Sequence, residues 1–364
     1  MSLTQLSLSH FRNIEAMTIT PSEHVNVILG ANGSGKSSLL EAIFFLSHGK
    51  SFRTTNTKLL IKHNQNRCVV HGKKSLHHLQ VPVGISKDAQ GESSIKIQGK
   101  VARRMSELAQ LLPVQVITPE SYSLFFGGPK ERRRFLDLGV FHVEHEFMLA
   151  WQQFSQVLKQ RNALLKTKPK KYSEQIKYWD KEFVRLAERV NACREAYISR
   201  FTELFFGKII DSLPFSEGLE IRFSPGWKTG EALQSELESH FERDVKLGYT
   251  SKGPHKCDFN FHINGISVEQ VLSRGQLKLL LYALKITQND LIETQSNKQS
   301  ILLIDDLPSE LSSETMDLVA RLLLLCKSQL FITAIDEQSI ASVVEPMKRE
   351  QKMFHVKHGN LITR

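Results

Sequence analysis

The sequence predicts an α/β fold with an antiparallel β subdomain and an inserted, coiled-coil-like helical lobe. A glycine-rich loop lies between a strand-like run and a helical pattern within residues 25–44. Short alternating apolar runs follow at 68–97, and apolar residues then recur at helical spacing between 142 and 208. Ile301–Ile304 is a continuous apolar run, which is typical of a parallel strand covered on both faces.

Residues 1–45 are expected to form a strand, a turn, a second strand, a loop and a helix. The apolar residues Leu3, Leu6, Leu8 and Phe11 predict an edge strand at the start of this segment. Further along, residues 68–97 hold three short strand-like runs separated by glycines. We interpret these runs as the antiparallel β subdomain.

The glycine-rich loop fits the phosphate-loop pattern G-x-x-x-x-G-K-[ST] at every fixed position. Its residues, all expected to bind nucleotide, are Gly30, Ala31, Asn32, Gly33, Ser34, Gly35, Lys36 and Ser37. Glycines allow backbone N–H groups to point at a polyphosphate, and the following helix adds partial positive charge at its N-terminus. Lys36 is expected to reach the terminal phosphates of ATP, and the Ser37 hydroxyl to hold Mg²⁺.

The helical segment contains a seam of apolar residues spaced alternately three and four apart. Its members are Ile176, Trp179, Phe183, Leu186, Val190, Cys193 and Tyr197. A weaker seam consists of Trp151, Phe154, Leu158 and Leu165, and the basic segment 166–171 separates the two. The pattern predicts an antiparallel helical hairpin with a basic tip. Two ordinary helices of a globular lobe are the alternative.

Strand and helix patterns return after the helical segment. We expect a strand near 219–223, a helix that contains Leu233, Leu237 and Phe241, a helix at 318–326 and a strand at 330–333. Residues 301–306 have the form of a Walker B strand, because an apolar run is followed by two carboxylates. Asp305 is expected to bind Mg²⁺ and Asp306 to polarise the attacking water, so that Asp305, Asp306 and Lys36 form the catalytic set.

The segment Leu272–Gln276 precedes a leucine-rich helix and lies 32 residues before Asp305. Ser273 is placed as a helix N-cap, and Gly275 removes side-chain bulk beside it. In this position the segment resembles the signature loop of ABC-type ATPases, which closes over the nucleotide of a second subunit. We therefore expect Ser273 and Gly275 to bind nucleotide across a two-fold homodimer that ATP stabilises.

The organisation predicted from these motifs is an ABC-type ATPase head interrupted by a helical lobe. Residues 1–140 are expected to form the N-terminal part of the head, with the phosphate loop and the β subdomain. Residues 141–207 are expected to form the lobe, and residues 208–364 the C-terminal part of the head.

Composition favours a polyanionic partner. The net charge is +10 and the isoelectric point is near 9.3. Residues 151–200 carry 12 Lys and Arg against 5 Asp and Glu, so much of the excess lies in the helical segment. No apolar run approaches the ~20 residues of a membrane helix, the N-terminus lacks signal-peptide features, and the four cysteines are widely spaced. We expect a cytoplasmic protein without a membrane partner, zinc site or disulfide framework.

Several blocks along nearly the whole length resemble the RecF family, bacterial recombination-mediator ATPases related to SMC proteins. The blocks are Leu6–Asn13, Gly49–Thr54, Pro119–Glu120 with Gly127–Asp137, Thr250–Lys256 and, more weakly, Phe354–Gly359. The resemblance implies ATP-dependent binding to gapped, single-stranded and duplex DNA in repair and replication restart. It also implies a link to the SOS response, assistance to RecA loading, and partners of the RecR and RecO type.

The chain departs from the family pattern at a few positions. Ser312 stands where the family usually has Asp, and Lys256-Cys257-Asp258 replaces a more common Arg-Asp-Asp. Asp306 stands where transporter ATPases carry Glu, and this shorter carboxylate leads us to expect weak ATP hydrolysis, used as a dimerisation switch.

Other candidates have more than one interpretation. The residues His142, Glu144, His145 and Glu146 do not follow a zinc-binding order, and His77-His78 is expected to be plain surface. Arg132–Arg134 could bind phosphate or pair with acidic neighbours inside the protein. Arg53 could touch the nucleotide or order the preceding loop. The lysines of the basic tip, Lys166, Lys168, Lys170 and Lys171, could meet a DNA backbone or be solvated.

Three other functions were considered. The ATPase subunit of a transporter is the main alternative, although the 269 residues from Lys36 to Asp305 exceed what such a subunit needs. An SMC-type chromosome-organising ATPase would require much longer helical arms than this insert supplies. A nuclease would require an added acidic metal-binding domain.

Overall fold

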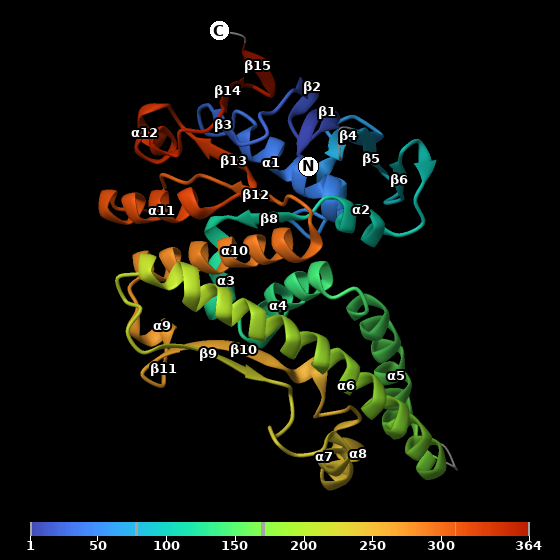
Figure 1. Cartoon of the computed structure of the whole chain (residues 1–364). Coiled ribbons are helices and arrows are strands. Elements are labelled where there is room, and N and C mark those ends of the chain that lie inside the picture. The colour runs from blue at the N-terminus through green and yellow to red at the C-terminus, as the bar shows by residue number, and fades with distance from the viewer. Residues whose placement is uncertain (1, 77–78, 169–171, 310, 363–364) are drawn as a thin grey trace. The chain divides into compact units, whose positions relative to one another are not determined.

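The computed structural model describes residues 2–76, 79–168, 172–309 and 311–362. Of the residues named above, His77, His78, Lys170 and Lys171 lie outside the described residues. The chain forms two compact units (Figure 1). Unit 1 comprises Met1–Ser121 and Arg274–Arg364, and unit 2 comprises Tyr122–Ser273. Each unit is described separately below.

Unit 1 contains an antiparallel sheet with the order β2-β1-β4-β5-β6-β7 among the described strands. The bounds are β1 Leu3–Phe11, β2 Ile14–Ile19, β4 Arg67–Leu76, β5 Leu79–Asp88, β6 Ser93–Ile97 and β7 Lys100–Val101. The antiparallel β subdomain is thereby confirmed. The prediction of an edge strand at the N-terminus was wrong, because β1 pairs with β2 on one side and β4 on the other. Alternating apolar residues indicate that one face of a strand is buried. They do not indicate which other strands pair with that strand on either side.

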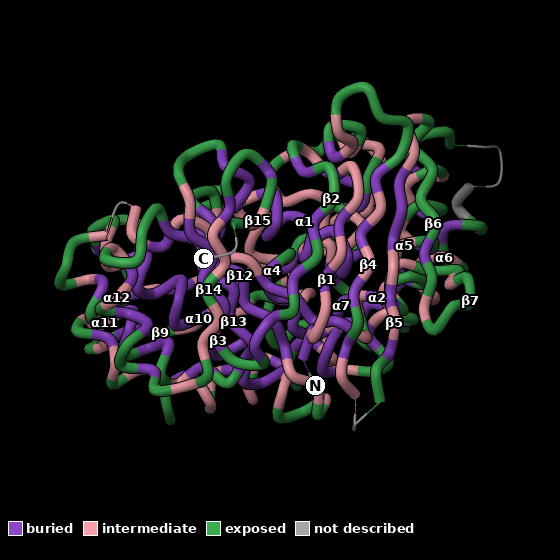
Figure 2. The backbone as a smooth tube through the Cα atoms, turned by 90° about the horizontal axis from the view of Figure 1, so that it is seen from above, coloured by how far each residue is buried: buried purple, intermediate pink, exposed green. Residues whose placement is uncertain are grey.

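A second, mainly parallel sheet of unit 1 has the order β15-β14-β3-β13-β12-β8. The bounds are β3 Val25–Leu29, β8 Val114–Ile117, β12 Ile301–Ile304, β13 Gln329–Ala334, β14 Gln351–Lys357 and β15 Asn360–Ile362. Within it only β15 is antiparallel to its neighbour. Every residue of β3, β12 and β13 is buried, as expected of parallel strands covered on both faces. Figure 2 shows how much of the backbone in this region is buried.

The helices of unit 1 cover these sheets. They are α1 Lys36–His48, α2 Met105–Leu111, α10 Arg274–Ser296, α11 Ser313–Leu325 and α12 Gln338–Val344. Helix α1 packs against strands of both sheets, and its residues Leu39, Leu40 and Ile43 belong to the core that joins them. The core therefore fixes the start of α1 relative to the end of β3, where the phosphate loop lies.

Helix α11 begins earlier than the predicted residue 318. Ser312 is its N-cap, and the Ser312 hydroxyl accepts a hydrogen bond of 3.2 Å from the Thr315 backbone N–H. Ser and Asp are about equally good N-caps. Ser312 in place of the usual Asp therefore still caps the start of α11.

Unit 2 combines helices with a small antiparallel sheet of order β11-β10-β9. The strands are β9 Leu219–Ser224, β10 Asp258–Ile263 and β11 Ile266–Ser267. The helices are α3 Ser123–Phe126, α4 Pro129–Val143, α5 Phe147–Thr167, α6 Tyr172–Leu204, α7 Leu233–Ser239, α8 Phe241–Leu247 and α9 Val268–Val271. The segment predicted as one helix around Leu237 is two short helices, because the chain leaves helical geometry at His240.

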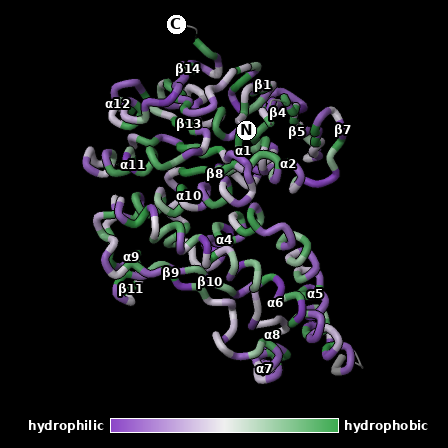
Figure 3. The backbone as a smooth tube through the Cα atoms, in the orientation of Figure 1, coloured by the Kyte–Doolittle hydropathy of each residue, from purple (hydrophilic) through white to green (hydrophobic). Residues whose placement is uncertain are grey.

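Helices α5 and α6 run antiparallel. Arg161 of α5 pairs with Asp180 at 2.6 Å, and Glu146, the N-cap of α5, pairs with Arg189 at 3.1 Å. The start of α5 therefore lies beside a later part of α6 than its end does. Both helices alternate between hydrophobic and hydrophilic residues (Figure 3). The seam of α6 is buried at Ile176, Phe183, Leu186, Val190 and Tyr197.

Compact unit 2 is larger than the helical lobe expected at residues 141–207. It also contains α4 and the strands β9–β11. Its limits, after Ser121 and after Ser273, do not coincide with the boundaries expected after residues 140 and 207. The reason is that α4 and β10 pack on the helices of the lobe: Arg194 of α6 pairs with Asp137 of α4 at 2.8 Å, and Phe201 contacts Phe259 of β10.

Candidate nucleotide-binding site

The phosphate loop connects β3 to α1, and two of its glycines are required by close contacts. An added Cβ at Gly30 would lie 2.3 Å from the backbone oxygen of Val356. Gly35 has φ +116°, and a Cβ there would lie 3.1 Å from Asn13 Nδ2. A side chain at either position would displace backbone or a packed neighbour. The loop is therefore held in one path between β14 and the turn after β1.

Lys36 is the first residue of α1 and folds back over its own loop. Its Nζ donates hydrogen bonds to the carbonyl oxygens of Gly30 at 2.6 Å and Ala31 at 3.1 Å. Burial lowers the pKa of Lys36, while the charges of Asp306 and Asp305 oppose that shift. The ammonium group thus lies within the loop and near both carboxylates that the sequence predicted to act with it.

Asp305 follows the last residue of β12 and lies beside the start of α1. Its Oδ1 accepts hydrogen bonds from Ser37 Oγ and from Thr333 Oγ1, each at 2.9 Å. Burial raises the pKa of Asp305, against the lowering effect of these two hydroxyl groups. The structure therefore brings together Ser37 and Asp305, the two residues expected to hold a magnesium ion.

Asp306 occupies the left-handed region at φ +55°. Its backbone N–H donates to Thr333 Oγ1 at 2.7 Å. The Thr333 hydroxyl therefore contacts both consecutive residues, Asp305 through its side chain and Asp306 through its backbone. The sequence predicts Thr333 only as part of a strand. Its place near the carboxyl end of a parallel strand next to β12 could have indicated the site, because the carboxyl ends of neighbouring parallel strands meet at one edge of a sheet.

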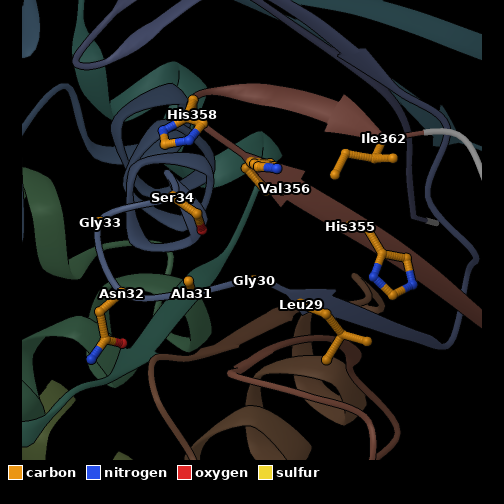
Figure 4. Close-up of a pocket in the computed structure, with 11 residues that line it drawn as sticks. Leu29, Gly30, Ala31, Asn32, Gly33, Ser34, His355, Val356, His358 and Ile362 are labelled. Atoms are coloured by element: carbon orange, nitrogen blue, oxygen red, sulfur yellow. The ribbon is translucent and has the colours of Figure 1, made fainter.

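The turn between β14 and β15 is a second part of the site that sequence reasoning missed. The Gly359 N–H donates to the Ser34 carbonyl at 2.8 Å. Residues 29–34 and the β14–β15 hairpin line a cavity of about 290 Å³ (Figure 4). Figure 4 shows Leu29 to Gly33 on one side of it and His355 and Ile362 on the other. The weak family block at 354–359 thus lies directly against the phosphate loop.

The block at residues 6–13 supports the loop from another direction. Ser38 Oγ donates to Asn13 Oδ1 at 2.9 Å, next to the glycines of the loop. Arg12 makes two hydrogen bonds of 2.8 and 2.6 Å to the fully buried carboxylate of Glu41 on α1. Ser51 donates to the same carboxylate, and Arg53, about half exposed, lies 3.8 Å from it. Arg53 is therefore held beside α1, and its charge lowers the pKa of Asp305.

The predicted signature loop lies where the chain passes from unit 2 into unit 1. Helix α10 begins at Arg274, so Ser273 directly precedes it. Gly275 lies in the first turn, where an added Cβ would be 3.2 Å from Thr315 Oγ1 of α11. The glycine thus permits close packing of α10 on α11 within unit 1.

Within the described residues no group of three or more His, Cys, Asp or Glu side chains is arranged to hold a metal ion. His142 is buried in α4. None of the described helices combines the length and the apolar character needed to span a bilayer.

Comparison with known proteins decides the family. The RecF/RecN/SMC N terminal domain model matches residues 2–360. A DNA replication and repair protein RecF from Pseudoalteromonas translucida is 65% identical over 364 residues, which is 100% of each chain. The chain belongs to the RecF family. RecF of Shewanella denitrificans is 43% identical, over 99% of both chains.

Solved structures agree with this assignment. The recombination mediator protein RecF-ATP in the RecFOR pathway superposes with a TM-score of 0.86 at 25% identity, covering 99% of this chain and 97% of that one. The Smc head domain of Pyrococcus furiosus has a TM-score of 0.57 at 16% identity, over 99% of this chain and 95% of that one, which shows a shared fold. The ABC-type ATPase fold expected from the motifs is confirmed.

The RecF-specific arginine block of α4 makes contacts inside unit 2. Arg132 makes hydrogen bonds of 2.8 and 2.9 Å to Asp258, and Arg133 donates to the Cys257 carbonyl at 2.8 Å. Arg134 pairs with Glu131 at 2.7 Å on the surface. Of the two interpretations left open, internal pairing holds for Arg132. Asp258, the acid retained in the altered Lys-Cys-Asp segment, is its partner.

Another block that resembles the RecF family, Thr250–Lys256, joins the helical hairpin to the rest of unit 2. The buried guanidinium of Arg161 contacts Asp180, Asp244 and Thr250 at 2.6, 3.0 and 2.8 Å. The buried Arg194 donates to the Pro254 carbonyl at 2.7 Å. The Arg194 guanidinium is paired on both sides by Asp137 as well, whereas Nη2 of Arg161 has no hydrogen-bond partner among the described residues. Most of the hydrogen-bonding capacity of the two buried cations is therefore met by partners inside unit 2, as burial of a charge requires. These residues are therefore structural.

Proposed function

We propose that this chain is an ATP-gated DNA-binding recombination mediator that acts in DNA repair and replication restart. The observation that carries the proposal is the grouping of Lys36, Ser37 and Asp305 at the start of α1, in a chain 65% identical to a RecF protein. Relatives solved as RecF-ATP and RecF-ATPrS share the fold over nearly the whole length. ATP is therefore the nucleotide we assign to the phosphate loop, residues 30–37.

The residues present suit a nucleotide with a magnesium ion. The Lys36 ammonium donates to two carbonyl oxygens of its own loop, and phosphate oxygens are stronger partners for a cation. Ser37 and Asp305 place a hydroxyl and a carboxylate 2.9 Å apart, and both are oxygen ligands that magnesium prefers. A bound ion would neutralise phosphate charge. Asp306 is assigned to orienting the attacking water, and we expect weak hydrolysis.

The proposed partners follow from the family. RecF proteins are described as part of the RecFOR pathway, so we propose RecR- and RecO-type partners and assistance to RecA loading. We further propose that two copies close on ATP, with Ser273 and Gly275 of each copy completing the site of the other. The closed dimer is assigned the higher affinity for gapped, single-stranded and duplex DNA, mostly through phosphate contacts.

The test is DNA binding in three nucleotide states. Labelled gapped, single-stranded and duplex DNA would be titrated with protein in ATP, ADP or no nucleotide, at two salt concentrations. We expect ATP to raise DNA affinity about tenfold. Lys36→Ala should abolish the increase, because the loop then lacks the cation that meets the terminal phosphates.

The matched control is Lys58→Ala, which removes an exposed lysine of unit 1 that is not part of the loop. It should retain the ATP effect. Equal DNA affinity in all three nucleotide states, or an ATP effect that survives Lys36→Ala, would rule out gating.

A further inference from the structure

A cavity of about 510 Å³ lies in unit 2 between α4 and α5. Its lining includes the second and third arginines of the RecF-specific block, Arg133 and Arg134. Arg133 also donates to the Cys257 carbonyl, and Arg134 pairs with Glu131. Nothing in the proposed nucleotide switch accounts for this cavity.

One wall of the cavity is apolar and only partly covered. It is formed by Leu138, Phe141, Met148 and Trp151, each of intermediate exposure. The Trp151 ring is fixed by the Arg194 guanidinium, 5.1 Å from its centroid, and by the Phe147 ring at 6.3 Å. A rigid tryptophan beside a methionine and an arginine is the composition that dominates binding energy at protein–protein interfaces.

The rim of the cavity is positively charged. Lys130, Arg133 and Arg134 lie within one turn of α4, three and four residues apart, and therefore share one face of the helix. Among the described residues of the lining, Asp137 is the only one with a carboxylate, and Arg194 donates to that carboxylate at 2.9 and 3.0 Å. Burial lowers the pKa of His255, also in the lining, to about 4, so its imidazole is neutral near pH 7.

We propose that this cavity binds an acidic peptide segment of a partner protein, with one apolar side chain against Trp151 and acidic side chains on the cations. The positive charge of the rim favours the acidic side chains of the peptide, and the aliphatic and aromatic wall favours its apolar side chain. A nucleic-acid strand is the less favoured occupant. Its phosphates repeat along the strand and require an extended track of cations. Among the described residues of the lining, the lysine and the arginines lie within about one turn of α4, and Leu138, Phe141 and Met148 form much of the wall.

The test uses fluorescein-labelled heptapeptides and the full chain. Each peptide carries one Leu, Phe or Trp flanked by Asp and Glu, and each has a partner peptide in which Asn and Gln replace the acids. Fluorescence anisotropy would compare the wild type with the double variant Lys130→Glu/Arg134→Glu. Both side chains are exposed, and melting temperature checks the fold of the variant. Lys159→Glu/Lys166→Glu, a pair of exposed lysines on α5 outside this lining, is the matched control.

We expect at least one acidic peptide to bind about tenfold more tightly than its amide partner. The double variant at 130 and 134 should lose that binding about tenfold, while the control stays within about twofold. The proposal is overturned if no peptide shows acid-dependent binding, or if the control variant loses as much as the test variant. It is also overturned if oligothymidylate, rather than peptide, is the probe whose affinity depends on Lys130 and Arg134, because the cavity then belongs to nucleic acid.

Discussion

At the scale of single residues, the burial of Asp305 disfavours the charged form of its carboxylate. Both hydroxyl hydrogen bonds, from Ser37 and Thr333, go to the same oxygen, Oδ1. The carboxylate charge is partly buried, and burial raises the pKa of Asp305 above its ordinary 3.8. An asparagine has the same oxygen with the same two lone pairs but no charge. The two hydrogen bonds can therefore be kept while the buried charge is removed.

We predict that Asp305→Asn stabilises the nucleotide-free protein by about 0.5–2 kcal/mol near neutral pH. Because the folded-state pKa is raised, the cost of the charge is absent below pH 3.8 and complete above the folded pKa. The advantage of the variant should therefore shrink as pH is lowered. Thermal melting at several pH values without nucleotide checks this expectation.

The same substitution should remove the magnesium-dependent part of ATP affinity. ATP affinity would be measured once with magnesium present and once with a chelator, and the difference is the magnesium-dependent part. Lys36→Ala serves as the comparison, because it should weaken ATP binding under both conditions. A nucleotide-free Asp305→Asn protein that melts below the wild type would show that favourable interactions with Lys36 and Arg53 outweigh the burial cost.

At the scale of elements, the phosphate loop is held by segments from opposite ends of the chain. The β14–β15 turn contacts it through Gly359, and the β1–β2 turn contacts it through Asn13. Gly359 has φ +76°, and an added Cβ would lie 2.5 Å from the Asn13 backbone oxygen. These two turns therefore meet each other as well as the loop, and only glycine fits between them.

We predict that Gly359→Ala lowers both stability and ATP affinity. Left-handed strain and the clash together should cost about 2–3 kcal/mol. Displacement of the turn from Ser34 should weaken ATP binding about tenfold. Thermal melting and fluorescent-nucleotide titration measure the two effects.

The control for this prediction is Gly265→Ala in the β10–β11 turn of unit 2. Gly265 has a similar φ of +80°, but the nearest atom to an added Cβ is Arg222 Nη2 at 3.8 Å. It should show the strain alone, about 1 kcal/mol, with unchanged ATP affinity. If the two variants bind ATP equally well, the β14–β15 turn does not position the loop.

The elements that the sequence predicted well are those with a local signal. The loop, the Asp305 strand and the seam of α6 each follow from residue types within a short window. The contacts of Gly359 with Ser34 and of Thr333 with Asp305 join distant segments, and a pattern in one segment does not name its partner. The same limit explains why β1 was predicted at an edge, and why the partner of Arg132 on β10 stayed open.

At the scale of the whole molecule, the chain passes between its two compact units at only two points, after Ser121 and after Ser273. The second of these points is Ser273, directly before α10, and it lies within the predicted signature loop. We propose that Ser273, at this junction, couples nucleotide binding in unit 1 to a second copy without forming part of the phosphate loop. The proposed switch therefore separates into two measurable steps: binding of ATP by one chain, and closure of two chains.

We predict that ATP doubles the mass of the wild-type protein in solution, and that Ser273→Arg blocks the doubling while ATP affinity changes less than about twofold. The arginine adds bulk where the second copy is proposed to approach, and Lys36, Ser37 and Asp305 are untouched. Light scattering measures the mass, and nucleotide titration at low protein concentration measures the affinity. Ser94→Arg, on an exposed position of β6, is the matched control and should still double. A Ser273→Arg protein that doubles in ATP would place the dimer contact elsewhere. A wild type that stays monomeric at saturating ATP would remove closure from the mechanism altogether.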